Sequence, residues 1–497
     1  MNQSDDTRRR VIKTLVLAGF GLHLVGCSSP EDPKKKPKTP PITDADTTNI
    51  DVIEKEVTSN NVTYFTTENE EFEDLATYFN LHTQKTPAII ALVVNAEGAS
   101  EAIKYAKEQN LPVSIKSGGH SFEQFSSNNG GLVINQSLLN QMEWGSNNEL
   151  IAGSACLLRD IYDFVLPEGR LLPAGSCGTV GLGGLTLGGG YGLFAREYGL
   201  TCDQMLEATL VDGNGYIHTV NNSHPIMWAL KGGGNGNFGV VTSFKMKTHP
   251  IPTEFRTTKF KAYKLDSVRS KELLTTWFDH AHKLPGHCFS AFVLNGRTLT
   301  VLVTYIKGKS HELDAMEAAM TPICDKTTTS NTTDIPKALK RYYGITHPIY
   351  FKNASAGYYS EMSEIEDCID EVLSTVVTTP GLIYQVNTLG GRINSSEFES
   401  SSCYPHRSYH YLSELQSYWN EGQDSQRDML LKAFEKVQAL FYDNGNRAQY
   451  RNYPSIGFPD WEESYYGKNY ERLQSIKLKY DPENTIRHEQ SIKLAES

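Results

Sequence analysis

The segment from Leu171 to Gly192, LLPAGSCGTVGLGGLTLGGGYG, constrains the fold of this 497-residue chain more than any other. It holds nine glycines and one cysteine, Cys177. An interior glycine costs about 0.5–1 kcal/mol relative to alanine, so we expect no ordinary helix or central strand here. Glycine also lets backbone N–H groups approach a ligand, and rows of these groups bind phosphate oxygens. Four apolar residues alternate with the glycines as buried residues would: Val180, Leu182, Leu185 and Leu187. This pattern favours a ligand cradle over a flexible linker.

Two further glycine-rich turns have the features of parts of the same cradle. Residues 112–121 read PVSIKSGGHS, a buried strand that runs into a turn carrying a histidine. Residues 231–241 read KGGGNGNFGVV, a turn that runs into a strand. Neither is a G-x-G-x-x-G motif that opens a helix after a strand, which disfavours a nicotinamide Rossmann site. Neither contains G-K-[ST], which excludes a Walker loop.

These segments together resemble a known family. SGGHS at 117–121, PAGSCGTVGLGGLTLGGGYGLFAREYGLTCDQ at 173–204 and WALKGGGNGNFGVV at 228–241 are similar to segments of FAD-linked oxidases of the berberine bridge enzyme and oligosaccharide oxidase type. YRNYPS at 450–455 and the segment 465–492 agree, and the resemblance covers roughly residues 79–492. It implies an α+β fold: a two-part FAD-binding domain of the PCMH type and a substrate domain with an antiparallel sheet covered by helices.

The resemblance also implies how the cofactor is held. In that family a histidine and a cysteine bond covalently to the flavin, at its 8α-methyl group and at C6, and the matching residues are His120 and Cys177. A core histidine and a buried or disulfide-bonded cysteine are the structural alternatives. The other residues expected to contact FAD are Ser117, Gly118, Gly119, Ser121, Gly175, Thr179, Val180, Gly183, Gly184, Gly189, Gly190, Tyr191, Gly239, Val241 and Asn452.

Tyr453 matches the catalytic tyrosine of the family. Because the ordinary pKa of tyrosine is about 10, a catalytic base of this type needs a nearby positive charge or hydrogen bonds. Arg451 would supply the charge if residues 450–453 formed a strand, since residues two apart share a face. Tyr450 and Glu414 are the alternative groups. Val180 matches a position near the oxygen-reacting face of the flavin, where a small residue is typical of members that use oxygen.

The N-terminus has the features of a bacterial export signal. Residues 7–13, TRRRVIK, resemble the twin-arginine pattern, and residues 14–25 form an apolar region too short to span a bilayer. LVGC at 24–27 resembles a lipobox, in which Cys27 carries the lipid. Residues 28–51 are rich in Pro, Lys and Thr and read as a disordered tether. We therefore expect an exported protein, lipid-anchored at the bacterial cell envelope, on the outer membrane or the periplasmic face.

The rest of the chain divides into three expected parts: an FAD-binding domain at 52–251, a substrate domain at 252–441 and a C-terminal return to the FAD-binding domain at 442–497. The first is expected to contain a β-α-β unit, with strands at 88–94 and 111–116 and a helix at 96–109. In the second, the pattern predicts strands at 289–294, 299–305 and 382–388, and helices at 267–282, 311–320 and 421–441.

Charge and cysteine spacing narrow the function. A net charge of −11 argues against a nucleic-acid partner. The eight cysteines lack the close spacing of a zinc site, although some could pair outside the cytoplasm. We expect oxidation of a CH–OH group, with a sugar or oligosaccharide hemiacetal preferred, by hydride transfer to bicovalent FAD, and reduction of oxygen to hydrogen peroxide. The alternatives are a dehydrogenase of an aromatic or natural-product alcohol that uses another acceptor, and a non-catalytic ligand-binding surface lipoprotein.

Overall fold

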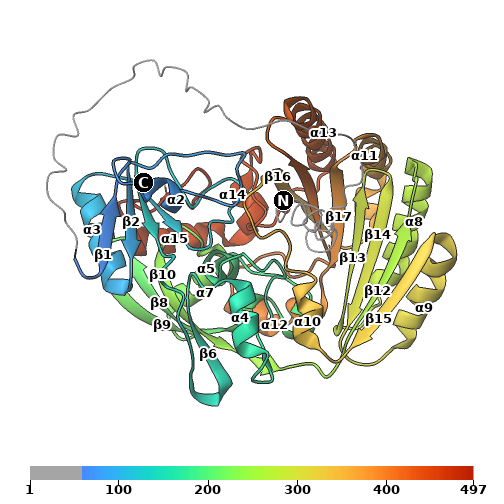
Figure 1. Cartoon of the computed structure of the whole chain (residues 1–497), viewed down its shortest axis with the longest axis horizontal. Helices are drawn as coiled ribbons and strands as arrows, with labels where there is room; N and C mark the ends of the chain where they lie inside the picture. Colours follow the sequence, from blue (N-terminus) through green and yellow to red (C-terminus); the bar gives the residue numbers. More distant parts are fainter. Residues whose placement is uncertain (1–58, 496–497) are drawn as a thin grey trace, which may run out of the picture.

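The structure of the chain, a computed structural model, describes residues 59–495. The strands of these residues form four sheets, and Figure 1 shows the smaller sheets on one side of the molecule and a seven-stranded sheet on the other. The expected signal at 1–27, the tether at 28–51 and the first residues of the expected FAD-binding domain lie outside the described residues. In the described part, no helix is long and apolar enough to cross a membrane.

The first sheet carries the turn with the candidate histidine. Its order is β1-β2-β4-β3, with β2, β4 and β3 parallel and β1 antiparallel. The strands are β1 (Val62–Phe65), β2 (Ile89–Val93), β3 (Val113–Lys116) and β4 (Leu132–Asn135). Helix α3 (Ala96–Glu108) follows Asn95, whose side chain accepts a hydrogen bond from the Gly98 N–H and caps the helix. The expected β-α-β unit is present, and β3 delivers residues 117–121 at its carboxyl end.

The second sheet is antiparallel and has the order β5-β6-β10-β8-β9. Its strands are β5 (Met142–Trp144), β6 (Glu149–Gly153), β8 (Met205–Asp212), β9 (Ile217–Asn221) and β10 (Gly239–Lys247). Helices α4 (Leu158–Val165) and α7 (Pro225–Gly233) pack beside it, and β7 (Arg170–Leu171) pairs with β11 (His249–Pro250). The expected strand–turn–strand pair around residues 212–215 is β8 and β9.

The glycine-rich segment contains one short helix, contrary to expectation. Helix α5 (Leu182–Leu187) forms although Gly183 and Gly184 lie inside it. Tertiary contacts override the low helix propensity of glycine. The two end leucines are buried, and the Gly183 N–H donates to the Ser154 carbonyl oxygen at 2.8 Å. The helix spans only six residues, so few unfavourable positions have to be offset.

The third main sheet is antiparallel throughout, with the order β15-β12-β14-β13-β17-β18-β16. Its strands are β12 (Phe255–Ala262), β13 (Cys288–Asn295), β14 (Thr298–Tyr305), β15 (Lys326–Thr332), β16 (Tyr350–Tyr359), β17 (Leu382–Thr388) and β18 (Tyr411–Trp419). One face of β16, β17 and β18 turns toward the glycine-rich turns. This antiparallel sheet with its covering helices confirms the expected fold class.

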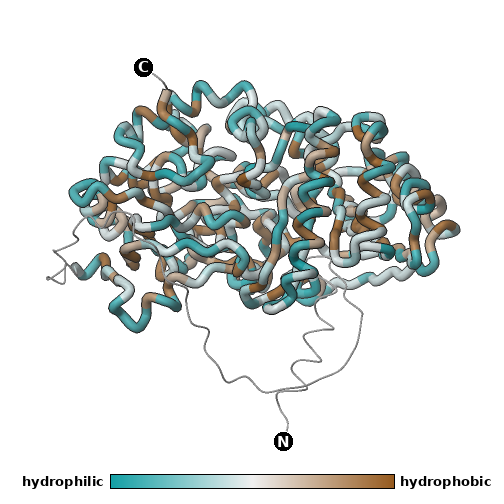
Figure 2. The backbone as a smooth tube through the Cα atoms, turned by 90° about the horizontal axis from the view of Figure 1, so that it is seen from above, coloured by the Kyte–Doolittle hydropathy of each residue, from teal (hydrophilic) through white to brown (hydrophobic). Residues whose placement is uncertain are grey.

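Four helices cover the other face of this sheet (Figure 1): α8 (Ser267–Ala281), α9 (His311–Met320), α11 (Glu366–Thr378) and α13 (Asp424–Asp443). In Figure 2 these outer helices carry both apolar and polar stretches, as amphipathic helices do. The last helix was expected at 421–441 and begins three residues later and ends two residues later. Shorter helices lie in the connections: α2 (Phe72–Leu75), α6 (Ala195–Tyr198), α10 (Ile335–Lys340) and α12 (Ser396–Ser401).

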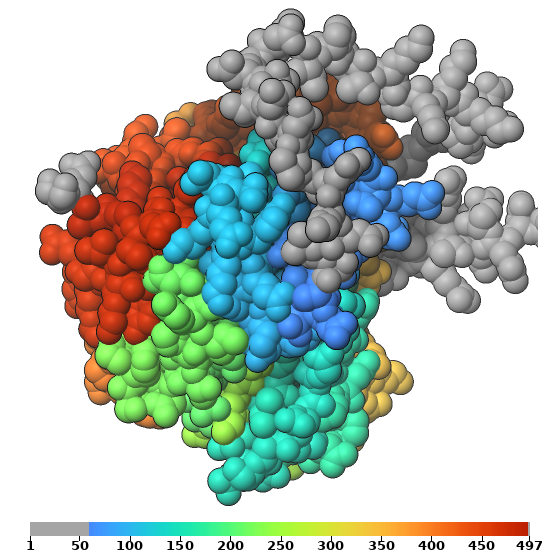
Figure 3. Space-filling view, turned by 90° about the vertical axis from the view of Figure 1, so that its left-hand side faces the viewer, coloured from blue at the N-terminus to red at the C-terminus, as the bar shows by residue number. Residues whose placement is uncertain are grey.

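The C-terminal segment contains α14 (Trp461–Tyr466) and α15 (Tyr470–Tyr480), which join the main hydrophobic core, and α15 contacts α7. The Val113 N–H of β3 donates to the Thr485 carbonyl oxygen, so the end of the chain extends the edge of the first sheet. Lys477 and Asp481 form a fully buried ion pair within this segment. Figure 3 shows the C-terminal segment against segments from the first half of the chain.

Candidate active site

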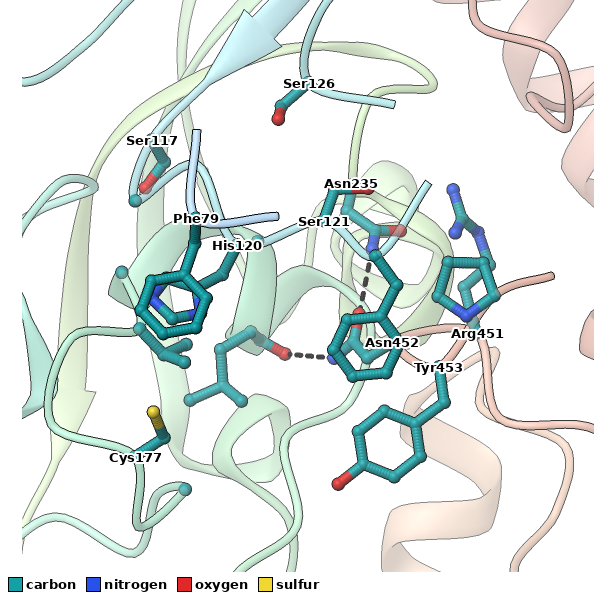
Figure 4. Close-up of a pocket in the computed structure, with 18 of the residues that line it drawn as sticks. Phe79, Ser117, His120, Ser121, Ser126, Cys177, Asn235, Arg451, Asn452 and Tyr453 are labelled. Atoms are coloured by element: carbon teal, nitrogen blue, oxygen red, sulfur yellow. Dashed lines mark hydrogen bonds between the residues drawn. The ribbon is translucent and has the colours of Figure 1, made fainter. Parts of the chain in front are cut away.

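A cavity of about 340 Å³ lies where the glycine-rich turns meet the seven-stranded sheet. Its walls come from the turn after β3, the segment 175–193, the turn before β10, strands β16, β17 and β18, and residues 450–454 (Figure 4). These segments are far apart in sequence, and the fold brings them together around one cavity.

Two glycine backbones meet at the base of the cavity. A Cβ atom on Gly118 would lie 2.4 Å from the Gly181 nitrogen, and one on Gly181 would lie 2.6 Å from the Gly118 nitrogen. Gly119 has a φ of 69°, which favours glycine. The first glycine turn and the glycine-rich segment therefore pack backbone to backbone, as one cradle requires.

His120 and Cys177 open into the same end of this cavity (Figure 4). The imidazole of His120 stacks on Phe79 with ring centroids 3.8 Å apart. Burial lowers the pKa of His120 to about 3, so the ring is neutral and one nitrogen keeps its lone pair. Burial also raises the pKa of the Cys177 thiol. All seven cysteines in the described part of the chain are free, which rules out the disulfide alternative for Cys177 in this structure.

Three of the expected FAD contacts do not line the cavity: Thr179, Gly189 and Gly190. The Thr179 hydroxyl donates to the Ile345 carbonyl oxygen at 3.4 Å. The glycines, with φ values of 125° and 84°, form a tight turn behind the cavity, and the Gly190 N–H donates to the Tyr450 hydroxyl at 2.8 Å. Their role is to shape the turn. The cavity is lined by the other expected residues: Ser117, Gly118, Gly119, His120, Ser121, Gly175, Cys177, Val180, Gly183, Gly184, Tyr191, Gly239, Val241, Asn452 and Tyr453.

A carboxyl group and two phenols form a cluster on the substrate side of the cavity. The Tyr453 and Tyr191 hydroxyls are 2.8 Å apart. Glu414 of β18 is 4% exposed and accepts a hydrogen bond from Gln416 Nε2 at 3.1 Å. Burial raises the pKa of Glu414 to about 8, and hydrogen bonds from Gln416 and Tyr453 offset part of this shift. Burial and the nearby Glu414 charge hold the pKa of Tyr453 well above 10. The carboxyl group is therefore the group that ionises most readily in this cluster.

The expected lowering of the Tyr453 pKa by Arg451 is wrong. Residues 450–453 form a turn and not a strand, so the alternation that would place both side chains on one face is absent. The guanidinium of Arg451 instead donates to the Tyr466 hydroxyl at 2.9 Å and lies 3.1 Å from His488 Nε2.

A row of polar side chains on the three strands was not expected from the sequence. It consists of Asn353, Gln385, Asn387, Gln416 and Tyr418. The Gln416 amide donates to the Gln385 amide oxygen at 3.1 Å, and the Asn387 amide donates to the Tyr191 hydroxyl at 3.1 Å. Larger polar side chains at every second position of a strand, as Gln385 and Asn387 in LIYQVNT and Glu414 and Gln416 in LSELQSYW, are the signal that could have found them.

Two segments that line this cavity match known protein families. Residues 87–221 match the family described as FAD binding domain, and residues 449–493 match the one described as berberine and berberine like. The chain is 28% identical to YgaK of Bacillus subtilis (strain 168), described as an uncharacterised FAD-linked oxidoreductase, over 86% of this chain and 96% of that one. In fold it is similar to a chitooligosaccharide oxidase (TM-score 0.79, 23% identity, 88% and 98% covered). It is also similar to a berberine bridge enzyme variant described as a reticuline dehydrogenase (TM-score 0.76, 23% identity, 88% and 97% covered).

The residues of the cavity fit FAD. At Gly118 and Gly181 a Cβ would clash with the facing backbone, so the two turns of the cradle pack this closely only as glycines. The Asn235 Oδ1 and Ser126 Oγ atoms line the cavity without a hydrogen-bond partner in the described residues, as expected for groups that meet a polar ligand. Both matched families contribute walls to this one cavity. The chain is therefore an FAD-linked oxidoreductase that has an FAD binding domain and a berberine-like C-terminal segment.

Proposed function

We propose that the protein is an exported oxidase of a sugar or oligosaccharide hemiacetal, with FAD bound covalently to His120 and Cys177. Bound FAD would supply the hydride acceptor, and oxygen would then take the electrons as hydrogen peroxide. The cluster of Glu414, Tyr453 and Tyr191 carries the proposal, because a carboxyl group and two phenols that line the cavity together can accept the proton of a bound alcohol.

The residues of this cluster have separate roles in the proposed reaction. Removal of a hydride from a carbinol carbon requires that the hydroxyl proton also leaves, and a positioned base contributes about 10²–10⁴-fold. The raised pKa of Tyr453 makes a resident phenolate unfavourable. Glu414, with a pKa of about 8, accepts the proton, either directly or through the Tyr453 hydroxyl. Tyr191 holds the Tyr453 hydroxyl in place.

The walls on the substrate side support an uncharged polyhydroxyl ligand. The strands on this side present the carboxamide groups of Asn353, Gln385 and Gln416, which can pair with sugar hydroxyls. Rings line the cavity beside these amides: Phe122 stacks on Tyr453 at 5.3 Å and meets the Phe351 ring edge-on at 5.4 Å. Rings and amides together suit a sugar, whose faces are apolar and whose edges are polar. The likeness to a chitooligosaccharide oxidase supports the same choice.

The cavity also supports covalent attachment and oxygen use. A neutral imidazole and a free thiol open into one end, where both could reach one edge of a planar ring system. Val180 lines the cavity three residues beyond Cys177, and its small side chain leaves room for oxygen. Export and lipid anchoring rest on the sequence features of residues 1–27, which lie outside the described residues.

A dehydrogenase of an aromatic alcohol is the second candidate. The rings of Phe79, Phe122 and Phe351 favour it, because an aromatic substrate could stack between them. The likeness to a reticuline dehydrogenase supports it too. The third candidate is a protein that binds a ligand without catalysis. The buried carboxyl group beside the two phenols disfavours this candidate.

Oxygen uptake in the presence of substrate panels separates these functions. Mono- and oligosaccharides form one panel and aromatic alcohols the other, with peroxide measured in parallel. We expect oxygen uptake with peroxide formation on the sugar panel. Anaerobic bleaching of the flavin by aromatic alcohols, without oxygen uptake, would replace the oxidase with the dehydrogenase. If neither panel bleaches the flavin, the non-catalytic binding protein becomes the supported function.

A further inference from the structure

Arg451 is a buried cation without an anionic partner at the cofactor cavity. It is the only arginine or lysine among the described residues that line the cavity, and its side chain is 4% exposed. In the described chain its polar contacts are a phenol, Tyr466, and an imidazole, His488, and no carboxylate pairs with it. A charge taken out of water without a counter-charge costs several kcal/mol. A fold that retains such a charge at a ligand cavity is suited to an anionic ligand group.

The surroundings of Arg451 hold it in position. Its guanidinium lies over the rings of Phe125 and Tyr465, 5.6 and 5.5 Å from their centroids. His488, which stacks on Phe125 at 4.5 Å, meets it from the side. Burial first, and then the charges of Arg451, Lys85 and Lys477, lower the pKa of His488 well below its usual value. A guanidinium only donates, so the neutral imidazole accepts from it and adds no second charge.

The two nearby lysines do not compete for the cavity. Lys85 pairs with Glu489 at 2.7 Å, and Lys477 pairs with Asp481 at 2.6 Å. Neither lines the cavity. Arg451 is thus the single uncompensated cation of the described site, and Figure 4 places it on the side opposite His120 and Cys177.

We propose that Arg451, positioned by His488 and Tyr466, binds an anionic group of FAD. Such a group has two sources in one cofactor. The diphosphate is anionic in every redox state, and the pyrimidine end of the isoalloxazine gains negative charge when the flavin is reduced. A guanidinium suits either, because its planar fork can donate two hydrogen bonds at once. The inference rests only on FAD binding, and not on the proposed substrate, acceptor or covalent links.

R451Q tests the inference with readouts that need no substrate. The flavin-to-protein ratio, measured in the His120→Ala/Cys177→Ala background so that no covalent link can retain the cofactor, reports on the diphosphate. The reduction potential and the affinity for sulfite, which adds to oxidised flavin as an anion, report on the isoalloxazine. We expect one of these equilibria to weaken about 10- to 100-fold, as for a lost charge-assisted hydrogen bond. R451K should recover most of the loss. R447Q is the matched control, because Arg447 lies on the same segment with its side chain 57% exposed.

The pattern of change identifies the source. A lower flavin content with an unchanged potential assigns Arg451 to the diphosphate. A normal content with a lower potential and weaker sulfite binding assigns it to the isoalloxazine. If R451Q keeps the content, the potential and the sulfite affinity of the wild type, the inference is wrong. R451M, whose unbranched stem can keep its contacts with Phe125 and Tyr465, is judged by the same criteria. If R451Q and R451M both fail to fold while R451K and R447Q fold, the charge of Arg451 serves the fold, and the inference is also overturned.

Discussion

Replacement of Glu414 by glutamine is the sharpest test of the proposed chemistry. The amide has nearly the same size and can still accept a hydrogen bond from Gln416, so the cavity should keep its shape. It cannot ionise, so it removes the proton acceptor alone. We expect flavin reduction by substrate to slow by about 10²–10⁴-fold, the usual contribution of a positioned base.

The raised pKa of Glu414 also fixes the pH dependence. Because the carboxylate is the active form, the rate of wild-type flavin reduction should rise with pH and level off above a pKa of about 8. Glu414→Gln should lose this dependence. Stability should change in the opposite sense. A carboxyl group whose pKa is raised from 4.5 to about 8 on folding stabilises the protein below the lower value and loses this contribution as pH rises through the upper one. The loss at pH 7 is on the order of 3 kcal/mol.

The assays are anaerobic stopped-flow reduction and denaturant unfolding, each across a range of pH. Glu421→Gln is the matched control, because Glu421 is exposed just beyond the end of the same strand. Relative to wild type, Glu414→Gln should gain stability as the pH rises, and Glu421→Gln should not. Near-normal reduction in Glu414→Gln, or an unchanged pH profile, would refute the assignment of Glu414 as the proton acceptor.

Three further outcomes are expected. Tyr453→Phe should keep the fold and slow flavin reduction by roughly 10²-fold or more in single turnover, leaving reoxidation by oxygen nearly unchanged; a near-normal reduction rate would exclude a role for its hydroxyl. Denatured wild-type protein should stay yellow, because we propose that FAD is linked covalently to His120 and Cys177. The single variants His120→Ala and Cys177→Ala should each keep one covalent link, and the double variant should release FAD on denaturation. A colourless wild-type precipitate would contradict both links. The mature chain should begin at Cys27 and partition with membranes, and Cys27→Ser should release it; a soluble wild type that retains residues 1–26 would overturn the anchor.

The cradle could be predicted from the sequence because its requirements are local. Gly118 and Gly181 must be glycines for their two backbones to touch, and this need is visible as a motif without knowledge of the fold. His120 could be predicted as well, because it directly follows such a turn. The β-α-β unit was predictable for the same reason, since the apolar spacing of α3 is a local property.

The substrate side depends on contacts that no local pattern specifies. Glu414 faces the cavity because β18 lies between β17 and β16 in a particular register, which pairs it with Gln385 and Ser355. A shift of one residue would turn it to the helix-covered face. Arg451 was misassigned because the conformation of residues 450–453 is set by packing against α14 and His488, and not by their own sequence.

The C-terminal return makes the cofactor site depend on segments that are synthesised long after its first parts. Strand β3 is made early, yet its edge is completed by Thr485, and the cavity wall by Tyr453 and His488. A ribosome makes these residues long after β3 has emerged. A nascent or truncated chain therefore holds the glycine cradle without the wall that closes it. We therefore expect a chain interrupted before Tyr453 to hold the cofactor less tightly than a chain that contains these residues.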